Sequence, residues 1–173
     1  MDHSDQAWEL PGLAASGPLP AMKEDLMLFG RFVGDWEIIE ARYPQPDGSI
    51  IVRRGRVNFR WILNGTAIQD VWSVLDERTG TYVPAGTTLR FYDKSNDLWR
   101  SVWVSPGGAV MQTFAGRKVG DRLVLEAQPD GAERWIFSDI APGSFRWHAE
   151  RTDDGGRSWT VTETMKVVRT SEG

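Results

Sequence analysis

The chain contains no cysteine, which excludes disulfide bonds and thiolate-bound metal sites. Histidine is almost as scarce, because His3 and His148 are the only two in 173 residues. Two histidines without cysteine are too few for a histidine-rich zinc or non-haem iron centre. Hydrolysis by a Ser-His-Asp triad is equally poorly supported, since the chain has no G-x-S-x-G motif. We therefore predict no metal and no cofactor.

An excess of basic residues and long apolar segments are also missing. The chain has 20 Lys and Arg against 24 Asp and Glu, a formal net charge of -4, so we expect no nucleic-acid partner. No run approaches 18 apolar residues, which predicts no membrane span. The first 20 residues lack the cationic start and apolar run of a signal peptide. These absences together predict a cytoplasmic protein of one domain.

Tryptophan, by contrast, is abundant. The nine are Trp8, Trp36, Trp61, Trp72, Trp99, Trp103, Trp135, Trp147 and Trp159. A tryptophan is accommodated where its large apolar body is buried while its indole N–H finds a partner. So many in one chain predict either an aromatic core or a cavity with aromatic walls.

The hydrophobic pattern divides the chain into an irregular arm over residues 1–21, one domain over 22–169 and a short tail over 170–173. Residues 22–33 space their apolar side chains at helical intervals and predict one short helix. From Trp36 onward the apolar period changes to two. The predicted strands are 36–43, 50–62, 67–75, 86–93, 98–104, 109–117, 122–128, 133–140, 144–152 and 158–169.

The segments between these strands are short and rich in Gly, Pro, Asn and Asp, as tight hairpins require. Ten antiparallel strands joined in this way form an up-and-down meander. Closing the meander into a barrel removes its two exposed edges. We therefore predict an all-β fold, a barrel of about ten antiparallel strands with an N-terminal helix at one end.

The hairpin before the last strand carries a recognisable spacing. Thr152, Asp154, Gly156 and Trp159 fit [S/T]-x-D-x-G-x-x-W, which resembles the Asp-box of sialidase propellers. The spacing occurs once, and the chain is too short for several four-stranded blades. A single hairpin carries no glycosidase machinery. We interpret it as a turn in which Asp154 caps backbone N–H groups while Trp159 packs beneath.

Two further features carry a family resemblance. Gly34-x-Trp36, entering the first strand after a helix, resembles the G-x-W signature of calycin-type barrels. In lipocalins a basic residue of the last strands lies over that tryptophan, and the resemblance assigns this place to Lys166 or Arg169. The segments WILNGTAIQDVW, FYDKSNDLWRSVWV and DGGRSW make residues 28–169 similar to a bacterial DUF1579-like group of lipocalin-like proteins. The tail lacks the R-x-Y carboxylate clamp of fatty-acid-binding proteins, which argues against a fatty-acid carrier.

The outer surface of a single-walled barrel meets water, so the more apolar face of each strand is expected to line the interior. The inward residues predicted by this rule are Val57, Phe59, Trp61, Ile68, Trp72, Val74, Trp99, Trp103, Trp135, Phe137, Phe145, Trp147, Ala149, Val161, Met165 and Val167. His148, the only candidate for an axial haem ligand, then faces outward. Arg54, Arg56 and Arg60 are then expected on the outer face of their strand, where long stems cover aromatic surface. With the opposite parity, this row could bind an anionic ligand.

Three carboxylates share faces with these apolar residues: Glu40, Asp70 and Glu163. A carboxylate on an apolar wall loses hydration, so its pKa rises unless a cation lies near it. Such a group could act as a general acid or base, or anchor a ligand hydroxyl or amine. The alternative is an internal pair with Arg90, Gln112 or a buried water.

Three functional hypotheses remain open at this point. The first is binding of a small hydrophobic molecule, aromatic or polyene-like, by Trp61, Trp72, Tyr92, Trp99, Trp103, Trp135, Trp147, Arg90 and Gln112. The second is a cofactor-free cyclase, isomerase or dehydratase with Asp70, Glu163 or Glu40 as general acid or base. The third is an interaction module with a solidly packed barrel. The sequence also leaves a homodimer open.

Overall fold

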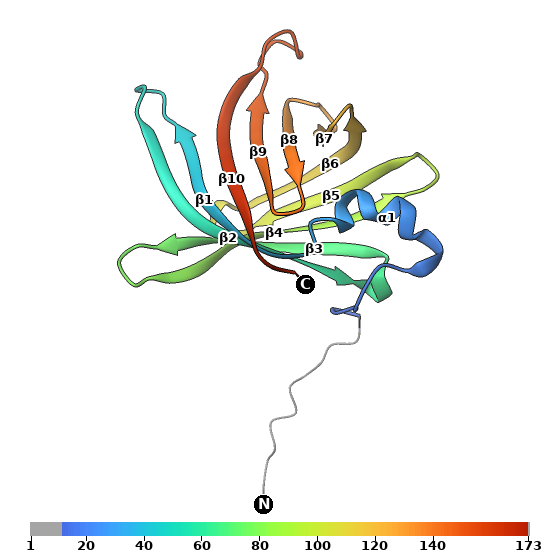
Figure 1. The fold of residues 1–173 in the computed structure, drawn as a ribbon. Helices are drawn as coiled ribbons and strands as arrows, with labels where there is room; N and C mark the ends of the chain where they lie inside the picture. Colours follow the sequence, from blue (N-terminus) through green and yellow to red (C-terminus); the bar gives the residue numbers. More distant parts are fainter. Residues whose placement is uncertain (1–11, 173) are drawn as a thin grey trace, which may run out of the picture.

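Ten antiparallel strands close into one barrel, as predicted, in a computed structural model that describes residues 12–172 (Figure 1). Each strand pairs with its neighbours in the chain, and β1 also pairs with β10. The strands are β1 (Gly34–Pro44), β2 (Ile50–Ile62), β3 (Ala67–Asp76), β4 (Thr81–Asp93), β5 (Leu98–Ser105), β6 (Val110–Val119), β7 (Arg122–Gln128), β8 (Glu133–Ala141), β9 (Ser144–Arg151) and β10 (Thr160–Glu172). Residues 1–11 of the predicted arm, with His3 and Trp8, lie outside the described residues.

The one α-helix among the described residues, α1 (Lys23–Gly30), is shorter than the predicted 22–33 and follows the 3-10 turn η1 (Pro20–Met22). Short 3-10 turns also follow β2 (η2, Leu63–Gly65) and β5 (η3, Pro106–Gly108). No helix in the described part of the chain combines the length and apolar character needed to cross a membrane.

The helix closes one end of the barrel with aromatic side chains. Phe29 of α1 and Phe32 just after it are both buried. The Phe29 ring lies 4.9 Å from the ring of Trp99, and the Phe32 ring lies 5.0 Å from that of Phe145. Offset and edge-on ring pairs of this kind add to the hydrophobic gain of burial. The side of α1 facing the strands is therefore part of the core.

Gly30 makes this close approach possible. A methyl group on its α-carbon would lie 2.7 Å from the Trp61 ring and 2.8 Å from the sulfur of Met27. Glycine at the last position of α1 therefore lets the helix rest directly on β2.

Arg169 of β10 ties the helix to the strands. Its guanidinium lies 4.0 Å from the centre of the Trp36 ring. It donates to the carbonyl oxygens of Arg31 and Val33 at 2.7 and 2.9 Å, and to that of Pro142 at 2.8 Å. Of the two residues that the resemblance suggested for the place over Trp36, the structure selects Arg169.

Irregularities of β1 and β10 change which side chains face inward. A register shift in β1 between Ile38 and Ala41 leaves both of these residues buried, with Ile39 and Glu40 between them. A second shift, in β10, lies between Val161 and Glu163. The prediction that Val161 faces inward is wrong, because its side chain is 39% exposed. A β-bulge adds one residue to a strand and so reverses the alternation beyond it.

Candidate functional site

A cavity of about 350 Å³ occupies the half of the barrel away from α1. Four half-buried tryptophans form much of its wall: Trp72 of β3, Trp103 of β5, Trp135 of β8 and Trp147 of β9. Their ring centres follow one another at 6.2, 5.9 and 5.4 Å, so they form a continuous aromatic belt. The volume of the cavity lies at the lower end of the range for small-molecule sites.

The floor of the cavity is the aromatic packing around the helix. Phe59, Phe137 and Phe145 line the cavity, and the Phe32 ring contacts all three from below at 5.8, 5.1 and 5.0 Å. The helix that closes the barrel therefore also sets the depth of the cavity.

Gly86 of β4 makes room for one tryptophan of the belt. A methyl group on its α-carbon would overlap the Trp103 ring. Because any larger side chain would displace this ring, Gly86 contributes to the shape of the wall without lining it.

An ion pair lies deep in the cavity wall. Asp70 of β3 and Arg90 of β4 are only 4% and 2% exposed, and the Asp70 carboxylate accepts a hydrogen bond from Nη2 of Arg90. The backbone N–H of Thr88 donates to the other carboxylate oxygen at 3.2 Å. Burial raises the pKa of Asp70, and the charge of Arg90 opposes that rise. Of the two alternatives for Asp70, the internal pair with Arg90 is the one observed.

Glu163 of β10 is the second acidic group on the cavity wall. Burial raises the pKa of its carboxyl to about 7, and the negative charge of Glu133 adds to the rise. A hydrogen bond from the Tyr43 hydroxyl acts in the opposite direction. Its Oε1 is buried without a hydrogen-bond partner among the described residues. A carboxyl group with this pKa exchanges protons near neutral pH, as a general acid or base must.

Several polar residues of the site were not anticipated. Thr88, Glu133 and Thr162 line the cavity together with the predicted Gln112. Glu133 accepts the indole N–H of Trp135 at 2.7 Å. Thr88 and Glu133 each stand two positions from a predicted cavity residue, so strand alternation alone could have identified them. Thr162 lies within the register shift of β10, and Tyr43 follows the shift of β1, so alternation could not have identified either residue.

The structure places four of the predicted site residues elsewhere. Trp61, Tyr92 and Trp99 lie at the end of the barrel that α1 closes, where Trp61 packs on Gly30 and Tyr92 packs on Trp99 at 6.1 Å. The hydroxyl of Tyr92 donates to Asp97 at 2.8 Å. Glu40 lies on the outer surface, 2.8 Å from Nζ of Lys166. The residues that come together at the cavity are Trp72, Trp103, Trp135, Trp147, Asp70, Arg90, Gln112 and Glu163.

The predicted row of arginines lies on the outer face of β2 in ion pairs and ring contacts. Arg54 lies 2.8 Å from Glu37, and Arg60 lies 2.6 Å from Asp35. The Arg56 guanidinium lies 3.8 Å from the centre of the Tyr82 ring. All three side chains are about half exposed, as expected for a solvated face.

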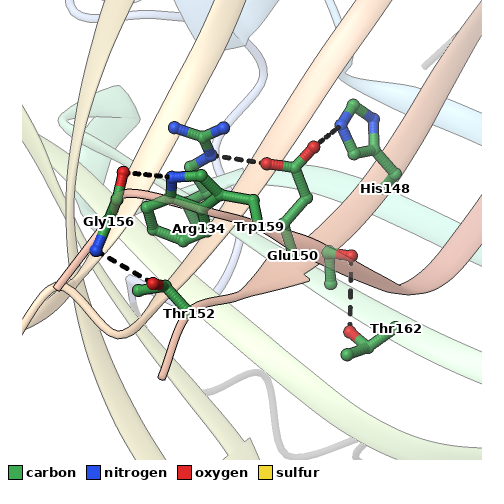
Figure 2. Close-up of polar contacts among 8 residues, drawn as sticks. Arg134, His148, Glu150, Thr152, Gly156, Trp159 and Thr162 are labelled. Carbon is green, nitrogen blue, oxygen red and sulfur yellow. Dashed lines mark hydrogen bonds and ion pairs between the residues drawn. The ribbon is translucent and has the colours of Figure 1, made fainter. Parts of the chain in front are cut away.

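The Asp-box hairpin between β9 and β10 has the structure expected of a well-formed turn. Asp154 accepts the backbone N–H groups of Arg157 and Ser158, both at 2.9 Å. The hydroxyl of Ser158 and these amides lower the pKa of Asp154 to about 2. Figure 2 shows the hydroxyl of Thr152 accepting the N–H of Gly156, whose carbonyl accepts the indole N–H of Trp159.

Beside this hairpin, the outer face of β8 and β9 carries a small charged cluster (Figure 2). Glu150 accepts a hydrogen bond from Nε of Arg134 at 2.6 Å and lies 3.1 Å from Nε2 of His148. The Arg134 guanidinium also lies 3.8 Å from the centre of the Trp159 ring. His148 therefore faces away from the cavity, and Arg134 joins the hairpin to the barrel wall.

Comparison with known proteins supports the fold. No family model matches the chain, and no curated protein matches it. Solved structures do match, among them the crystal structure of Rv2717c from M. tuberculosis, with a TM-score of 0.59 and 12% sequence identity. The match covers 89% of this chain and 99% of that one. At this identity the likeness shows the fold alone, and the resemblance to the DUF1579-like group stays a prediction. The chain is a closed ten-stranded antiparallel barrel whose aromatic interior is compatible with ligand binding.

Proposed function

We propose that the protein binds a small hydrophobic molecule, aromatic or polyene-like, in the cavity between the four tryptophans. The observation that carries this proposal is the belt of Trp72, Trp103, Trp135 and Trp147 along the wall of the cavity. Flat indole rings offer large apolar contact areas to a planar or conjugated guest. A few convergent polar groups among predominantly apolar walls are typical of small-molecule sites.

The test is to fill the cavity from within. Ala149 lines the cavity, whereas Ala115 of β6 lies between the inward-facing Phe114 and Gly116 and faces outward. We expect Ala149→Phe to weaken the binding of 2-acetylnaphthalene and retinol at least tenfold in tryptophan-fluorescence titrations. Ala115→Phe is the matched control and should bind as the unmodified protein does. If neither compound binds the unmodified protein, the proposal fails for both ligand classes.

Glu163 favours a second candidate function, a cofactor-free cyclisation, isomerisation or dehydration. Its carboxyl group reaches the cavity with one oxygen unpartnered among the described residues, and its pKa is about 7. A closed aromatic cavity can also hold a flexible substrate in a reactive conformation. For a substrate that is turned over, we expect Glu163→Gln to abolish turnover and leave its affinity nearly unchanged. A substrate bound with equal affinity but turned over at an unchanged rate would exclude this role.

A further inference from the structure

The wall of the cavity contains buried hydrogen-bond donors that have no acceptor among the described residues. Arg90 uses Nη2 for Asp70, and its Nε and Nη1 are buried without a partner. The indole N–H of Trp72, another residue of the cavity wall, is also buried without a partner. A buried donor without an acceptor costs about 1–3 kcal/mol, and more when it is charged. An acceptor on a bound molecule would remove this cost.

Aromatic packing keeps the Arg90 guanidinium near this position. Its central carbon lies 5.1 Å from the centre of the Phe29 ring and 5.4 Å from that of Phe59. Phe29 belongs to the helix and Phe59 to the floor of the cavity. The guanidinium is therefore held between the closed end and the cavity, where its planar N–H groups have few alternative positions.

The charge of Arg90 is already balanced. Asp70 supplies one negative charge to the same buried site, so the pair is neutral as a whole. A ligand carboxylate would bring a second negative charge close to Asp70, and like charges in a poorly solvated site repel strongly. A neutral acceptor on the ligand would accept hydrogen bonds from the unused N–H groups of Arg90 without this repulsion.

We propose that the ligand of this cavity is uncharged and carries a carbonyl group, as in a ketone, ester or quinone, which accepts hydrogen bonds from Arg90 and Trp72 of the cavity wall. This inference rests on the proposed binding function and defines the chemical class of the ligand. Hydrogen bonds to the carbonyl would fix the orientation of the molecule in the cavity. Glu163 would then face another part of the molecule, because its strand β10 is separated from β4 by three strands in one direction around the barrel and by five in the other.

Three naphthalenes of nearly equal shape test the proposal on the full chain. They are 2-acetylnaphthalene, 2-isopropenylnaphthalene, in which a CH₂ group replaces the carbonyl oxygen, and the anionic 2-naphthoate. In calorimetric titrations we expect the ketone to bind about tenfold more tightly than either of the others. Equal affinity for the ketone and the alkene would overturn the inference and leave the binding function standing. Tightest binding of 2-naphthoate would also overturn it, in favour of an anionic ligand.

Variants of the protein then test which hydrogen-bond donors cause the preference for the ketone over the alkene. The double variant Asp70→Leu/Arg90→Met removes the pair without leaving a single buried charge. We expect its preference for the ketone over the alkene to fall to about one while the alkene still binds. The matched control is Asp93→Leu/Arg100→Met, which removes a surface pair at 2.8 Å and should keep the full preference.

A milder variant keeps the test decisive if the double variant does not fold. Trp72→Phe retains an aromatic ring in the wall and removes only the indole N–H. We expect it to reduce the preference for the ketone over the alkene several-fold, whatever the change in affinity that the two compounds share. An unchanged preference in Trp72→Phe would contradict the role of the indole. Absence of binding by all three naphthalenes to the unmodified protein would contradict both the inference and the proposed function.

Discussion

At the scale of single residues, the side chain with the clearest expected pH dependence is Glu163. Its pKa is about 7 in the folded protein against a usual value of 4.5, because burial disfavours the charged form. Between these two pH values the folded state binds more protons than the unfolded state. Stability contributed by the neutral carboxyl is therefore present below about pH 4.5 and is lost as the pH rises through about 7.

We expect Glu163→Gln to remove this loss, because the amide is neutral at every pH. Urea unfolding at pH 5 and pH 8 should show the free energy of unfolding of the unmodified protein falling by on the order of 2 kcal/mol more than that of the variant. Glu126→Gln, on the exposed face of β7, is the control and should follow the unmodified protein. Equal pH dependence in Glu163→Gln and the unmodified protein would show that this carboxyl does not titrate as described.

Gly86 allows a second prediction at the same scale. Gly86→Ala forces the Trp103 ring out of its place in the aromatic belt, because the added methyl group would overlap it. We expect a loss of about 1–3 kcal/mol in the free energy of unfolding and weaker binding of 2-acetylnaphthalene. Gly143→Ala, where the methyl group meets no neighbour within 4 Å, should change neither quantity. Unaltered binding by a folded Gly86→Ala protein would mean that Trp103 does not shape the site.

At the scale of elements, the Asp-box hairpin depends on one ionised carboxylate. Asp154 has a pKa of about 2 because it accepts hydrogen bonds from Ser158 and Arg157. The contribution of this carboxylate is present above about pH 4 and is lost as the pH falls toward 2. Because Asp154→Ala removes the carboxylate at every pH, we expect the hairpin of this variant to lose the same hydrogen bonds at neutral pH.

Amide hydrogen exchange measured by NMR would show the effect on the hairpin. The amides of Arg157 and Ser158 should lose protection in Asp154→Ala, while the strands of the barrel keep theirs. Asp153→Ala, one residue earlier, is the control. Faster exchange throughout β9 and β10 would instead mean that the hairpin supports the barrel as a whole.

The elements also show what alternation along a sequence can and cannot predict. A period of two identifies the inward face of a strand, and it correctly placed Trp72, Trp103 and Trp135 on the cavity wall. The alternation does not indicate how far along the barrel axis a side chain lies. Trp61 and Trp99 share the inward face but lie at the height of α1, so they pack against the helix.

Bulges were the second limit on the sequence-based prediction. In β1, the register shift after Ile38 turns Glu40 outward and brings Tyr43 to Glu163. In β10, the register shift before Glu163 turns Val161 outward. A bulge depends on the twist and pairing of both neighbouring strands, which a single strand sequence does not specify. The strands and turns were predictable because each depends on residues close together in the chain.

At the scale of the whole molecule, Arg169 connects the last strand to the chain segment that follows α1. We expect Arg169→Met to lower the free energy of unfolding by about 2–3 kcal/mol, because three carbonyl groups lose a charged donor. Amide exchange over residues 23–33 should accelerate more than exchange in β5 and β6. Lys166→Met, on the outer surface of the same strand, is the control. Uniform acceleration across the barrel would show that Arg169 does not act on the helix in particular.

The pairing of β1 with β10 also has a consequence for how the protein is made. Gly34–Pro44 is synthesised well before one of its two partners, Thr160–Glu172, because eight other strands lie between them in the chain. Until then β1 presents an open edge to other chains in the cell. Contacts between such distant segments form slowly, because a long loop must close first. We therefore expect the open edge of β1 to favour aggregation until β10 has been synthesised and has paired with it.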